Sequence, residues 1–337
     1  MQNDTATIGR DLEFAIEKLE ANGLVAIPTE TVYGLAANAL EAEAVVKIFE
    51  AKKRPSFDPL IVHIKGTEDL AKYAKVIPDQ AGRLAQALWP GPLTIVLPKH
   101  SIIPDLTTSG LDSVAIRSPR HSLTRQLLGM LDFPLAAPSA NPFGYLSPTR
   151  PEHVADQLAG EVDYILDGGP CEVGLESTII SFIDPGKIEM LRAGGYVREE
   201  IEEILGTQLS VRTHSSSNPS APGMLAQHYA PRTPLLIVDA DEVPDMNTLR
   251  SFGFLEKSKN PKIAYIKLIP TQNPPEWATD AFAWSDDGNL RQAAARLFAL
   301  LRTLDGQNYD LIVAERVPPR GLGLAINDRL SRAAHQS

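Results

Sequence analysis

The segment spanning residues 52–64 places three cations directly before an apolar strand pattern. Lys52, Lys53 and Arg54 end a helical pattern, two prolines then extend the chain, and His63 lies inside the strand pattern. An arginine fork binds two phosphate oxygens at once, and a lysine adds a point charge. The same cations could instead complement the dipole of the helix that they end. From this segment alone, two interpretations stay open: the cations bind an anion, or they only stabilise the end of the helix.

Other polar segments also follow strand patterns, which is where open α/β sheets build ligand sites. Arg117 ends an apolar strand, where an unpaired charge is costly, so it needs a carboxylate or phosphate partner. Because acidic residues are abundant in this part of the chain, an internal salt bridge is the alternative. Residues 138–149 set small donors between prolines that fix the backbone, which suits a phosphate or a ribose but is also typical of a stiff surface loop.

The common nucleotide-binding and hydrolase motifs are absent from this sequence. It contains no G-x-x-x-x-G-K-[ST] loop, no G-x-G-x-x-G after a strand pattern and no G-x-S-x-G elbow. The seven histidines show no metal-ligand spacing, and a single cysteine excludes a cysteine-cluster metal site. We therefore expect no resident metal ion, and Mg²⁺ would arrive with a nucleotide that holds it through its phosphates.

The elements that must position these residues alternate between helix and strand patterns. Over residues 1–210 they interleave without strict βαβ order, which indicates a mixed twisted sheet with helices. Residues 211–232 predict a linker, and residues 233–337 predict a small doubly wound, Rossmann-like α/β domain. Residues 28–35 predict a polar turn. Helices are expected at 10–22, 41–53, 67–75, 79–88, 121–131, 198–205, 289–304 and 321–334, and strands at 24–27, 60–64, 93–97, 114–117, 135–137, 164–166, 177–182, 188–191, 235–238, 263–266 and 311–314.

Composition places the chain among soluble globular proteins, with 43% apolar and 22% charged residues in 337. No apolar run reaches the roughly 18 residues of a membrane span, and the first residues do not form a signal peptide. The single cysteine fits a reducing cytoplasm. Residues 1–210 carry 18 Lys and Arg against 29 Asp and Glu, a net charge of −11, which disfavours tRNA as a tightly bound ligand.

Taken together and in order, these segments resemble the YrdC/Sua5 family of threonylcarbamoyl-AMP synthases. Any one motif is weak evidence, but seven in the same order make chance agreement improbable. The resemblance covers residues 8–206, and the stretch 220–231 with the following α/β domain is similar to the two-domain Sua5 type. The motifs that carry it are Pro28–Leu35, Lys52-x-Arg54-Pro55, Trp89–Thr94, Arg117-Ser-Pro, Pro138–Asn141, Ser177-Thr178 and Leu191-Arg192-x-Gly-Gly195.

The resemblance implies a nucleotidyltransferase that converts L-threonine, bicarbonate and ATP into threonylcarbamoyl-AMP and pyrophosphate, with Mg²⁺ bound to the ATP. The product would pass to the machinery that makes the t6A37 modification of tRNA. By the same resemblance, the catalytic residues are Lys52, Arg54, Ser139 and Asn141; the threonine-binding residues are Thr31, His63, Arg117 and Ser177; and the ATP-binding residues are Arg54, Asp58, Ser113, Ala137, Ser139, Ser147, Arg192 and Tyr229. Many family members carry asparagine at the position of Asp58. A carboxylate there would repel the phosphates of ATP.

Two other functions stay open at this point. A carbamoyltransferase of the hydrogenase-maturation type contains a similar domain, but it adds cysteine-rich zinc fingers that one cysteine cannot build. A double-stranded RNA or ribosome-binding module would need a basic groove on an acidic domain.

For the enzyme, residues 220–231 predict a lid that closes over the first domain and protects a labile carbamoyl-adenylate from water. The sequence does not indicate an oligomeric state.

Overall fold

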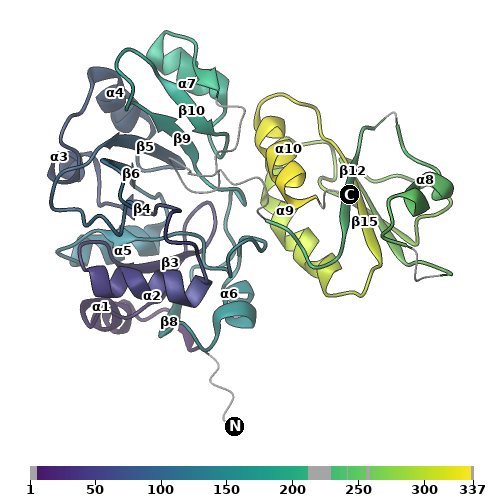
Figure 1. Ribbon diagram of the computed structural model, residues 1–337, viewed down its shortest axis with the longest axis horizontal. Helices are drawn as coiled ribbons and strands as arrows, with labels where there is room; N and C mark the ends of the chain where they lie inside the picture. The colour runs from purple at the N-terminus through teal and green to yellow at the C-terminus, as the bar shows by residue number, and fades with distance from the viewer. Residues whose placement is uncertain (1–5, 212–228, 241, 256–258, 335–337) are drawn as a thin grey trace. The chain divides into compact units, whose positions relative to one another are not determined.

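The computed structural model describes residues 6–211, 229–240, 242–255 and 259–334. The chain divides into two compact units, coloured from purple to teal and from green to yellow in Figure 1. The first unit comprises residues 1–143 and 147–226, and the second comprises residues 144–146 and 227–337. Most of the predicted linker and lid, residues 212–228, lies outside the described residues. The predicted domain limits therefore stay predictions.

The described part of the first unit is built on one sheet of 11 strands, in the order β1-β8-β2-β3-β7-β4-β6-β5-β9-β10-β11. Strand β6, next to the central strand β4, is parallel to β4 and antiparallel to β5, so the predicted mixed sheet is confirmed. The strands are β1 Ile8–Gly9, β2 Val25–Ile27, β3 Gly34–Asn38, β4 Ile61–His63, β5 Leu93–Pro98, β6 Ser113–Arg117, β7 Leu135–Ala136, β8 Tyr164–Leu166, β9 Thr178–Ser181, β10 Glu189–Arg192 and β11 Ser210–Val211.

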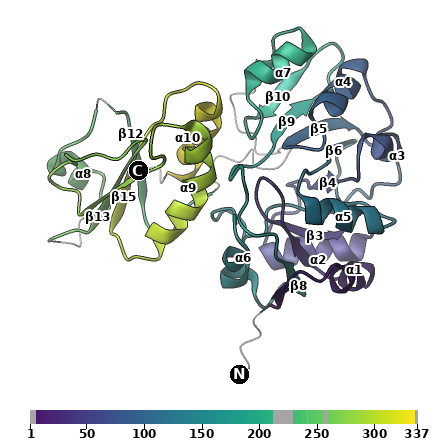
Figure 2. The ribbon, with the colours of Figure 1, turned by 180° about the vertical axis from the view of Figure 1, so that it is seen from behind.

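Helices cover both faces of this sheet, because alternate strand residues point to opposite sides. In β2, Ala26 packs into the core beneath α2, whereas Val25 and Ile27 pack into a second core beneath α1 and α5. Figure 2 shows these layers from behind. The helices are α1 Leu12–Glu20, α2 Ala42–Lys52, the short 3₁₀ turn η1 Thr67–Asp69, α3 Leu70–Tyr73, α4 Asp79–Leu88, α5 Ser122–Met130, α6 Pro151–Leu158 and α7 Arg198–Leu205.

The end of α2 determines where two predicted catalytic residues lie. Lys53 adopts a left-handed conformation with φ +51°, and the N–H of Arg54 bonds back to Phe49 O at 2.9 Å. This backbone reversal satisfies carbonyls at the helix end. Lys52 is left in the buried last turn, with its side chain directed to the interior, while Lys53 is exposed. The local turn therefore separates two adjacent lysines into an internal and an external one.

Strand β3, Gly34–Asn38, is the main departure of the structure from the elements expected from the sequence. Residues 28–35 were expected to be a polar turn, but Gly34 already begins β3, which is antiparallel to β2. All five residues of β3 are buried on both faces, so they show no polar-apolar alternation. The short elements β1, β11 and α6, and in the second unit β14 and α8, also had no predicted counterpart.

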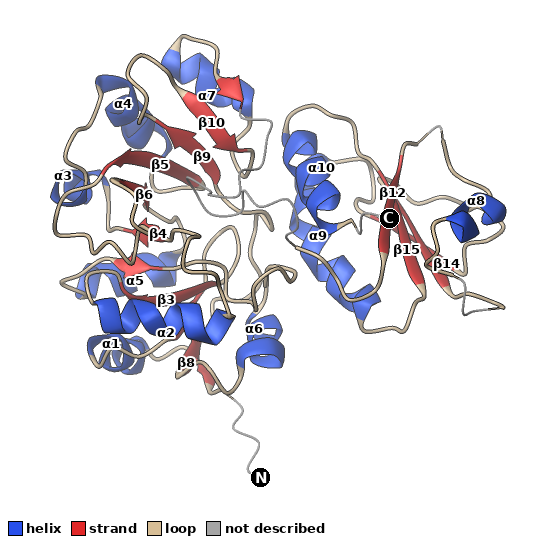
Figure 3. Cartoon of the chain, in the orientation of Figure 1, coloured by secondary structure: helices blue, strands red, loops and turns tan. Residues whose placement is uncertain are grey.

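The second unit contains a sheet whose four described strands run parallel in the order β12-β15-β13-β14. Figure 3 shows α9 and α10 on one side of it and α8 on the other, as expected of a doubly wound domain. The elements are β12 Leu235–Val238, α8 Met246–Ser251, β13 Ile263–Lys267, β14 Asp280–Ala283, α9 Leu290–Asp305, β15 Leu311–Glu315 and α10 Leu322–Ala333. Across the described ranges of both units, no helix combines the length and apolar character needed to cross a membrane.

Candidate active site

Lys52 links the end of α2 to the proline-rich loop at residues 138–149. Its side chain is 1% exposed, and Nζ donates hydrogen bonds to Ser139 O and Asn141 O, both at 2.5 Å. Burial, and then the charge of Arg54, lower the pKa of Lys52 well below its usual value, while Asp58 opposes this shift. An ammonium has three donors. Two of them bind the loop, so the third can donate to an anion. The negative charge of that anion would favour the protonated form of Lys52.

Arg54 and Asp58 form a buried ion pair. Arg54 Nη2 lies 2.8 Å from Asp58 Oδ2, and Arg54 also donates to the carbonyl oxygens of Asp58 and Pro59, each at 3.0 Å. Burial raises the pKa of Asp58, although Arg54, Lys52 and Arg192 act in the opposite direction. The expected repulsion between Asp58 and phosphates is therefore reduced by the cations around it. Asp58 holds Arg54 in place, and its nucleotide contact stays a prediction.

The loop that carries Ser139 and Asn141 is joined to the chain around β3. Ser139 pairs with Gly34 in an isolated bridge, and Tyr33 O accepts from Ala140 N at 2.8 Å. Further along the loop, Tyr33 N donates to Pro148 O at 2.8 Å. The two ends of the loop are therefore part of the internal framework of the first unit rather than a free surface segment. The backbones of Ser139 and Asn141 therefore lie beside Lys52, and the catalytic roles of both residues stay predictions.

Arg117 is held by two residues of the segment before β3. Its Nη2 donates to Glu30 Oε1 at 2.7 Å and its Nη1 to Thr31 Oγ1 at 2.9 Å. The internal salt bridge that the sequence left open is therefore present. Burial raises the pKa of Glu30, but the charge and hydrogen bond of Arg117 outweigh it and hold the net pKa below its usual value. Arg117 Nε is buried and has no hydrogen-bond partner among the described residues, so one donor stays available for a ligand.

His63 lies level with Arg117 in the pairing of β4 with β6. Its Nδ1 is 3.2 Å from Ile61 O, and the side chain is 2% exposed. Burial, reinforced by the charge of Arg117, lowers the pKa of His63 to about 3. His63 is therefore a neutral hydrogen-bonding group at physiological pH, and it does not serve as a proton donor of ordinary strength.

The neutral state of His63 gives a testable result. In NMR spectra of protein labelled in its histidine rings, His63 should show no titration between about pH 5 and pH 8. His63→Gln identifies the signal by removing it. Because the lowered pKa leaves the ring uncharged throughout this window, the His63 shifts should stay constant. A midpoint near the ordinary value of 6.5 would contradict the assigned environment.

Ser177 lies between the ends of β5 and β10. Its Oγ is 2.7 Å from Thr94 Oγ1 and accepts from Arg192 Nη2 at 3.1 Å, while Arg192 Nε donates to Ser177 O at 3.0 Å. Gly194 allows this close approach, since a Cβ there would lie 2.3 Å from Glu176 O. The predicted threonine-binding serine and the predicted ATP-binding arginine are therefore direct neighbours.

Among the described residues, two further predicted nucleotide contacts, Ser113 and Ala137, make no side-chain hydrogen bond to these groups, although Ala137 N and His63 Nδ1 share Ile61 O as their partner. Ser113 begins β6 and Arg117 ends it, which separates them by about 13 Å along the strand. Ala137 donates its backbone N–H to Ile61 O at 3.0 Å, and its side chain is 6% exposed. Nothing in these positions tests a contact with ATP, so both assignments stay predictions.

Tyr229 belongs to the second unit in this structure. It is 1% exposed, adopts φ +68°, and lies with its ring centroid 5.5 Å from that of Phe298. The guanidinium carbon of Arg329 lies over the same ring, 5.3 Å from its centroid. The contact of Tyr229 with ATP also stays a prediction, and the neighbouring lid residues up to 228 lie outside the described range.

Two buried carboxylates were not among the predicted site residues. Glu30 holds Arg117, and Glu176 Oε1 accepts from Ser147 Oγ at 2.6 Å. The signal for Glu30 was the need of Arg117 for a partner, because Glu30 lies in a segment already recognised as polar. Glu176 directly precedes Ser177 in the sequence, but nothing local connects it to Ser147.

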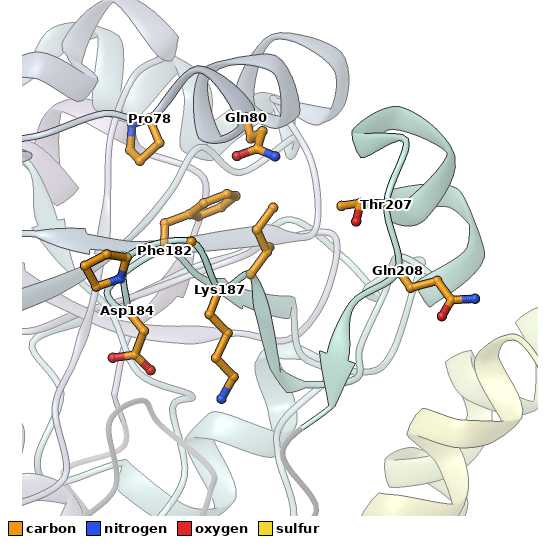
Figure 4. A pocket seen from close by; sticks show the side chains of 10 residues that line it. Pro78, Gln80, Phe182, Asp184, Lys187, Thr207 and Gln208 are labelled. Atoms are coloured by element: carbon orange, nitrogen blue, oxygen red, sulfur yellow. The ribbon is translucent and has the colours of Figure 1, made fainter.

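A separate cavity of about 310 Å³ lies near α4 and α7. Figure 4 shows it between Gln80, Phe182 and Thr207, with Lys187 and Gln208 at its margin. It shares no residue with the predicted site. Among the described residues, no group of three or more His, Cys, Asp or Glu side chains is arranged to hold a metal ion.

Comparison with known proteins decides the family. The profile described as "Telomere recombination" matches residues 17–194, and the profile described as "Threonylcarbamoyl-AMP synthase, C-terminal domain" matches residues 196–335. A threonylcarbamoyl-AMP synthase of Pyrococcus abyssi is 41% identical over 317 residues, covering 92% of this chain and 90% of that protein. The chain belongs to the threonylcarbamoyl-AMP synthase family. The resemblance seen in the sequence is thereby confirmed, and the chain is an enzyme of the ATP-using transferase type.

Other members of the threonylcarbamoyl-AMP synthase family agree in sequence and in fold. The Bacillus subtilis synthase is 40% identical over 329 residues, covering 94% of this chain and 90% of that protein. The crystal structure of P. abyssi Sua5 complexed with L-threonine superposes with a TM-score of 0.86 at 38% identity, covering 98% of this chain and 97% of that one. The predicted combination of a mixed-sheet domain with a C-terminal α/β domain is therefore confirmed.

Proposed function

We propose that this protein makes threonylcarbamoyl-AMP from L-threonine, bicarbonate and ATP at the residues around Lys52 and Arg117. The observation that carries the proposal is the pair of hydrogen bonds from buried Lys52 to Ser139 O and Asn141 O, since it unites the implied catalytic residues in a chain of this family. The named complex of P. abyssi Sua5 with L-threonine supports an amino-acid substrate.

The proposed reaction has two bond-forming steps. The amine of threonine attacks the carbon of bicarbonate, and loss of water leaves a carbamate. A carbamate oxygen then attacks the α-phosphorus of ATP, and the bond to the bridging oxygen breaks with release of pyrophosphate. Adenylyl transfer of this kind depends on positioning and on stabilising charge at the phosphates. It needs no covalent nucleophile from the protein.

The triphosphate would be bound by the cationic part of the site. Lys52 and Arg54 supply positive charge and hydrogen-bond donors. Arg192, which lies next to Ser177, adds a third cation. One loop supplies Ser139, Asn141 and Ser147. Asp58 neutralises part of this charge, which keeps Arg54 fixed before ATP binds. Mg²⁺ would enter with ATP as part of the substrate, held by its phosphates.

Threonine would be bound by the groups around Arg117. The buried Arg117 Nε is a donor for the substrate carboxylate, and Thr31 already lies against the same guanidinium. Neutral His63 and the hydroxyl of Ser177 offer hydrogen bonds without adding charge. Glu30 orients Arg117 and offsets part of its charge before the substrate arrives. In this arrangement the carboxylate of threonine and the phosphates of ATP meet separate cations.

The alternatives left open by the sequence receive less support. Residues 1–210 carry a net charge of −11, which opposes RNA as the principal ligand. The hydrogenase-maturation type is disfavoured because the similar synthases match more than 90% of this chain, and the match includes the C-terminal region of the chain.

We infer that the product is handed to the tRNA t6A transferase machinery rather than used by this chain.

The proposal is tested by measuring pyrophosphate release from ATP in mixtures that lack one component. Release should require L-threonine and bicarbonate together, because neither alone forms the carbamate that attacks ATP. D-Threonine is the matched control, since it carries the same groups in the wrong geometry. Pyrophosphate release at the full rate without threonine would contradict the proposed activity.

A further inference from the structure

The second unit holds three residues of the loop that we propose binds ATP. Residues 144–146 lie in the sequence between Asn141 and Ser147, yet they belong to the second unit with residues 227–337. The loop therefore leaves the first unit and returns to it within a few residues. What holds these three residues also limits the positions of the residues on either side.

Tyr145 contacts three other residues of the second unit. Its hydroxyl donates to Asp305 Oδ2, and the guanidinium carbons of Arg302 and Arg232 lie 5.2 and 5.7 Å from its ring centroid. Burial, and then the hydrogen bond to Asp305, raise the pKa of Tyr145 to about 12, so the phenol keeps its donor proton at neutral pH. We call Tyr145, Arg232, Arg302 and Asp305 the tyrosine clamp.

The backbone on both sides of Tyr145 is held as well. Gly144 O accepts from Ala230 N at 2.8 Å, and Leu146 O accepts from Arg302 Nη2. The second oxygen of Asp305 accepts from Thr233 N at 2.7 Å, which fixes the carboxylate that Tyr145 meets. Residues 144–146 are thus bound to the rest of the second unit through a ring, a hydroxyl and two carbonyl groups. We conclude that their position is fixed within that unit.

The flanks of this segment are fixed in the first unit by the proposed ATP-binding groups. Asn141 O accepts from Lys52, and Ser147 Oγ donates to Glu176. Ser147 is two residues beyond Tyr145, and each residue spans at most about 3.6 Å. A shift of Tyr145 by several ångströms would therefore pull directly on Ser147, and through Asn141 on the carbonyl bound by Lys52.

We propose that the tyrosine clamp is a positioning device through which the C-terminal domain sets the geometry of the ATP-binding loop. Its members do not touch the reacting atoms; they act through Asn141 and Ser147. This assigns the C-terminal domain a task in the first domain's chemistry, and it rests on the proposed function. Loss of the clamp should weaken ATP binding and leave threonine binding largely unchanged, because Arg117, Glu30 and Thr31 do not lie on this loop.

The test uses the full chain with Tyr145→Phe and Arg302→Met. The first removes only the hydroxyl that meets Asp305, and the second removes the donor to Leu146 O together with the guanidinium over the ring. Tyr309→Phe is the matched control, since it removes a tyrosine hydroxyl that donates to Asp280 at 2.7 Å elsewhere in the second unit. Hydrogen exchange of a peptide covering residues 138–149 is measured without ligand, and KM is measured for ATP and for threonine.

We expect faster exchange in both clamp variants and a KM for ATP raised about tenfold, the effect of losing one charge-assisted hydrogen bond, with the KM for threonine within twofold. Tyr309→Phe should match the wild type. Unchanged exchange in both clamp variants would overturn the clamp. Faster exchange with an unchanged KM for ATP would overturn its positioning role. If the wild type shows no turnover, the proposed function fails; exchange still tests the clamp, and calorimetric ATP binding replaces KM.

Discussion

Replacing Lys52 by alanine should reduce the rate of threonylcarbamoyl-AMP formation at least about 100-fold, the effect of losing a donor that stabilises the transition state. Two consequences act together. The charge beside the phosphates is removed, and the carbonyls of Ser139 and Asn141 lose the donor that holds them. Arg54→Ala should have a similar effect on the rate, because its guanidinium is the neighbouring cation and Asp58 would be left without its ion-pair partner.

The neighbouring lysine provides a matched control for Lys52. Lys53 follows it directly but is exposed, and its φ of +51° is a conformation that asparagine tolerates, so Lys53→Asn should turn over at nearly the wild-type rate. Initial rates of pyrophosphate release, with circular dichroism to confirm folding, separate the cases. A folded Lys52→Ala variant within tenfold of the wild-type rate would refute the role given to Lys52.

Replacing Arg117 by glutamine should both abolish threonine binding and destabilise the first unit. Glu30 is 2% exposed, so without Arg117 it becomes a buried charge with no ionic partner, which costs about 3–5 kcal/mol. The loss should be largest above the ordinary glutamate pKa of 4.5 and smaller below it, because protonation then removes the unpaired charge. The double variant Glu30→Gln, Arg117→Gln should recover most of the stability and none of the threonine binding.

Calorimetric melting and threonine titration of these variants separate folding from recognition. Arg120→Gln is the matched control, since it breaks only an exposed pair with Glu172 and should barely change the melting temperature. If the double variant were no more stable than Arg117→Gln, the unpaired charge of Glu30 would not be the cause of the loss. If Arg117→Gln bound threonine as well as the wild type, the recognition role would fail.

Elements with a clear pattern were predicted closely from the sequence. The strand at 164–166 and the helix at 198–205 were predicted with the bounds that the structure gives, and the helix at 41–53 differs by one residue at each end. Strand β3 was not predicted, because its small buried residues follow a polar turn and carry no alternation. A strand buried on both faces is defined by its neighbours in the sheet, which a single local window does not contain.

The site was predictable where one residue's chemistry demanded a partner, and less so where partners come from distant segments. The charge at the end of β6 predicted a partner for Arg117, and the structure supplies Glu30. The bonds from Lys52 to the carbonyls of residues 139 and 141, and from Ser147 to Glu176, depend on backbone positions that no motif encodes. The same holds for Tyr145, whose partners lie more than 80 residues further along the chain.

The most direct test of the account is to supply ¹³C-bicarbonate with ATP and L-threonine and to identify the nucleotide product by mass spectrometry. The account predicts threonylcarbamoyl-AMP that carries one ¹³C atom, formed together with pyrophosphate and strongly reduced in Lys52→Ala. Formation of AMP or ADP without any labelled threonine adduct, at a rate unaffected by Lys52→Ala, would contradict it.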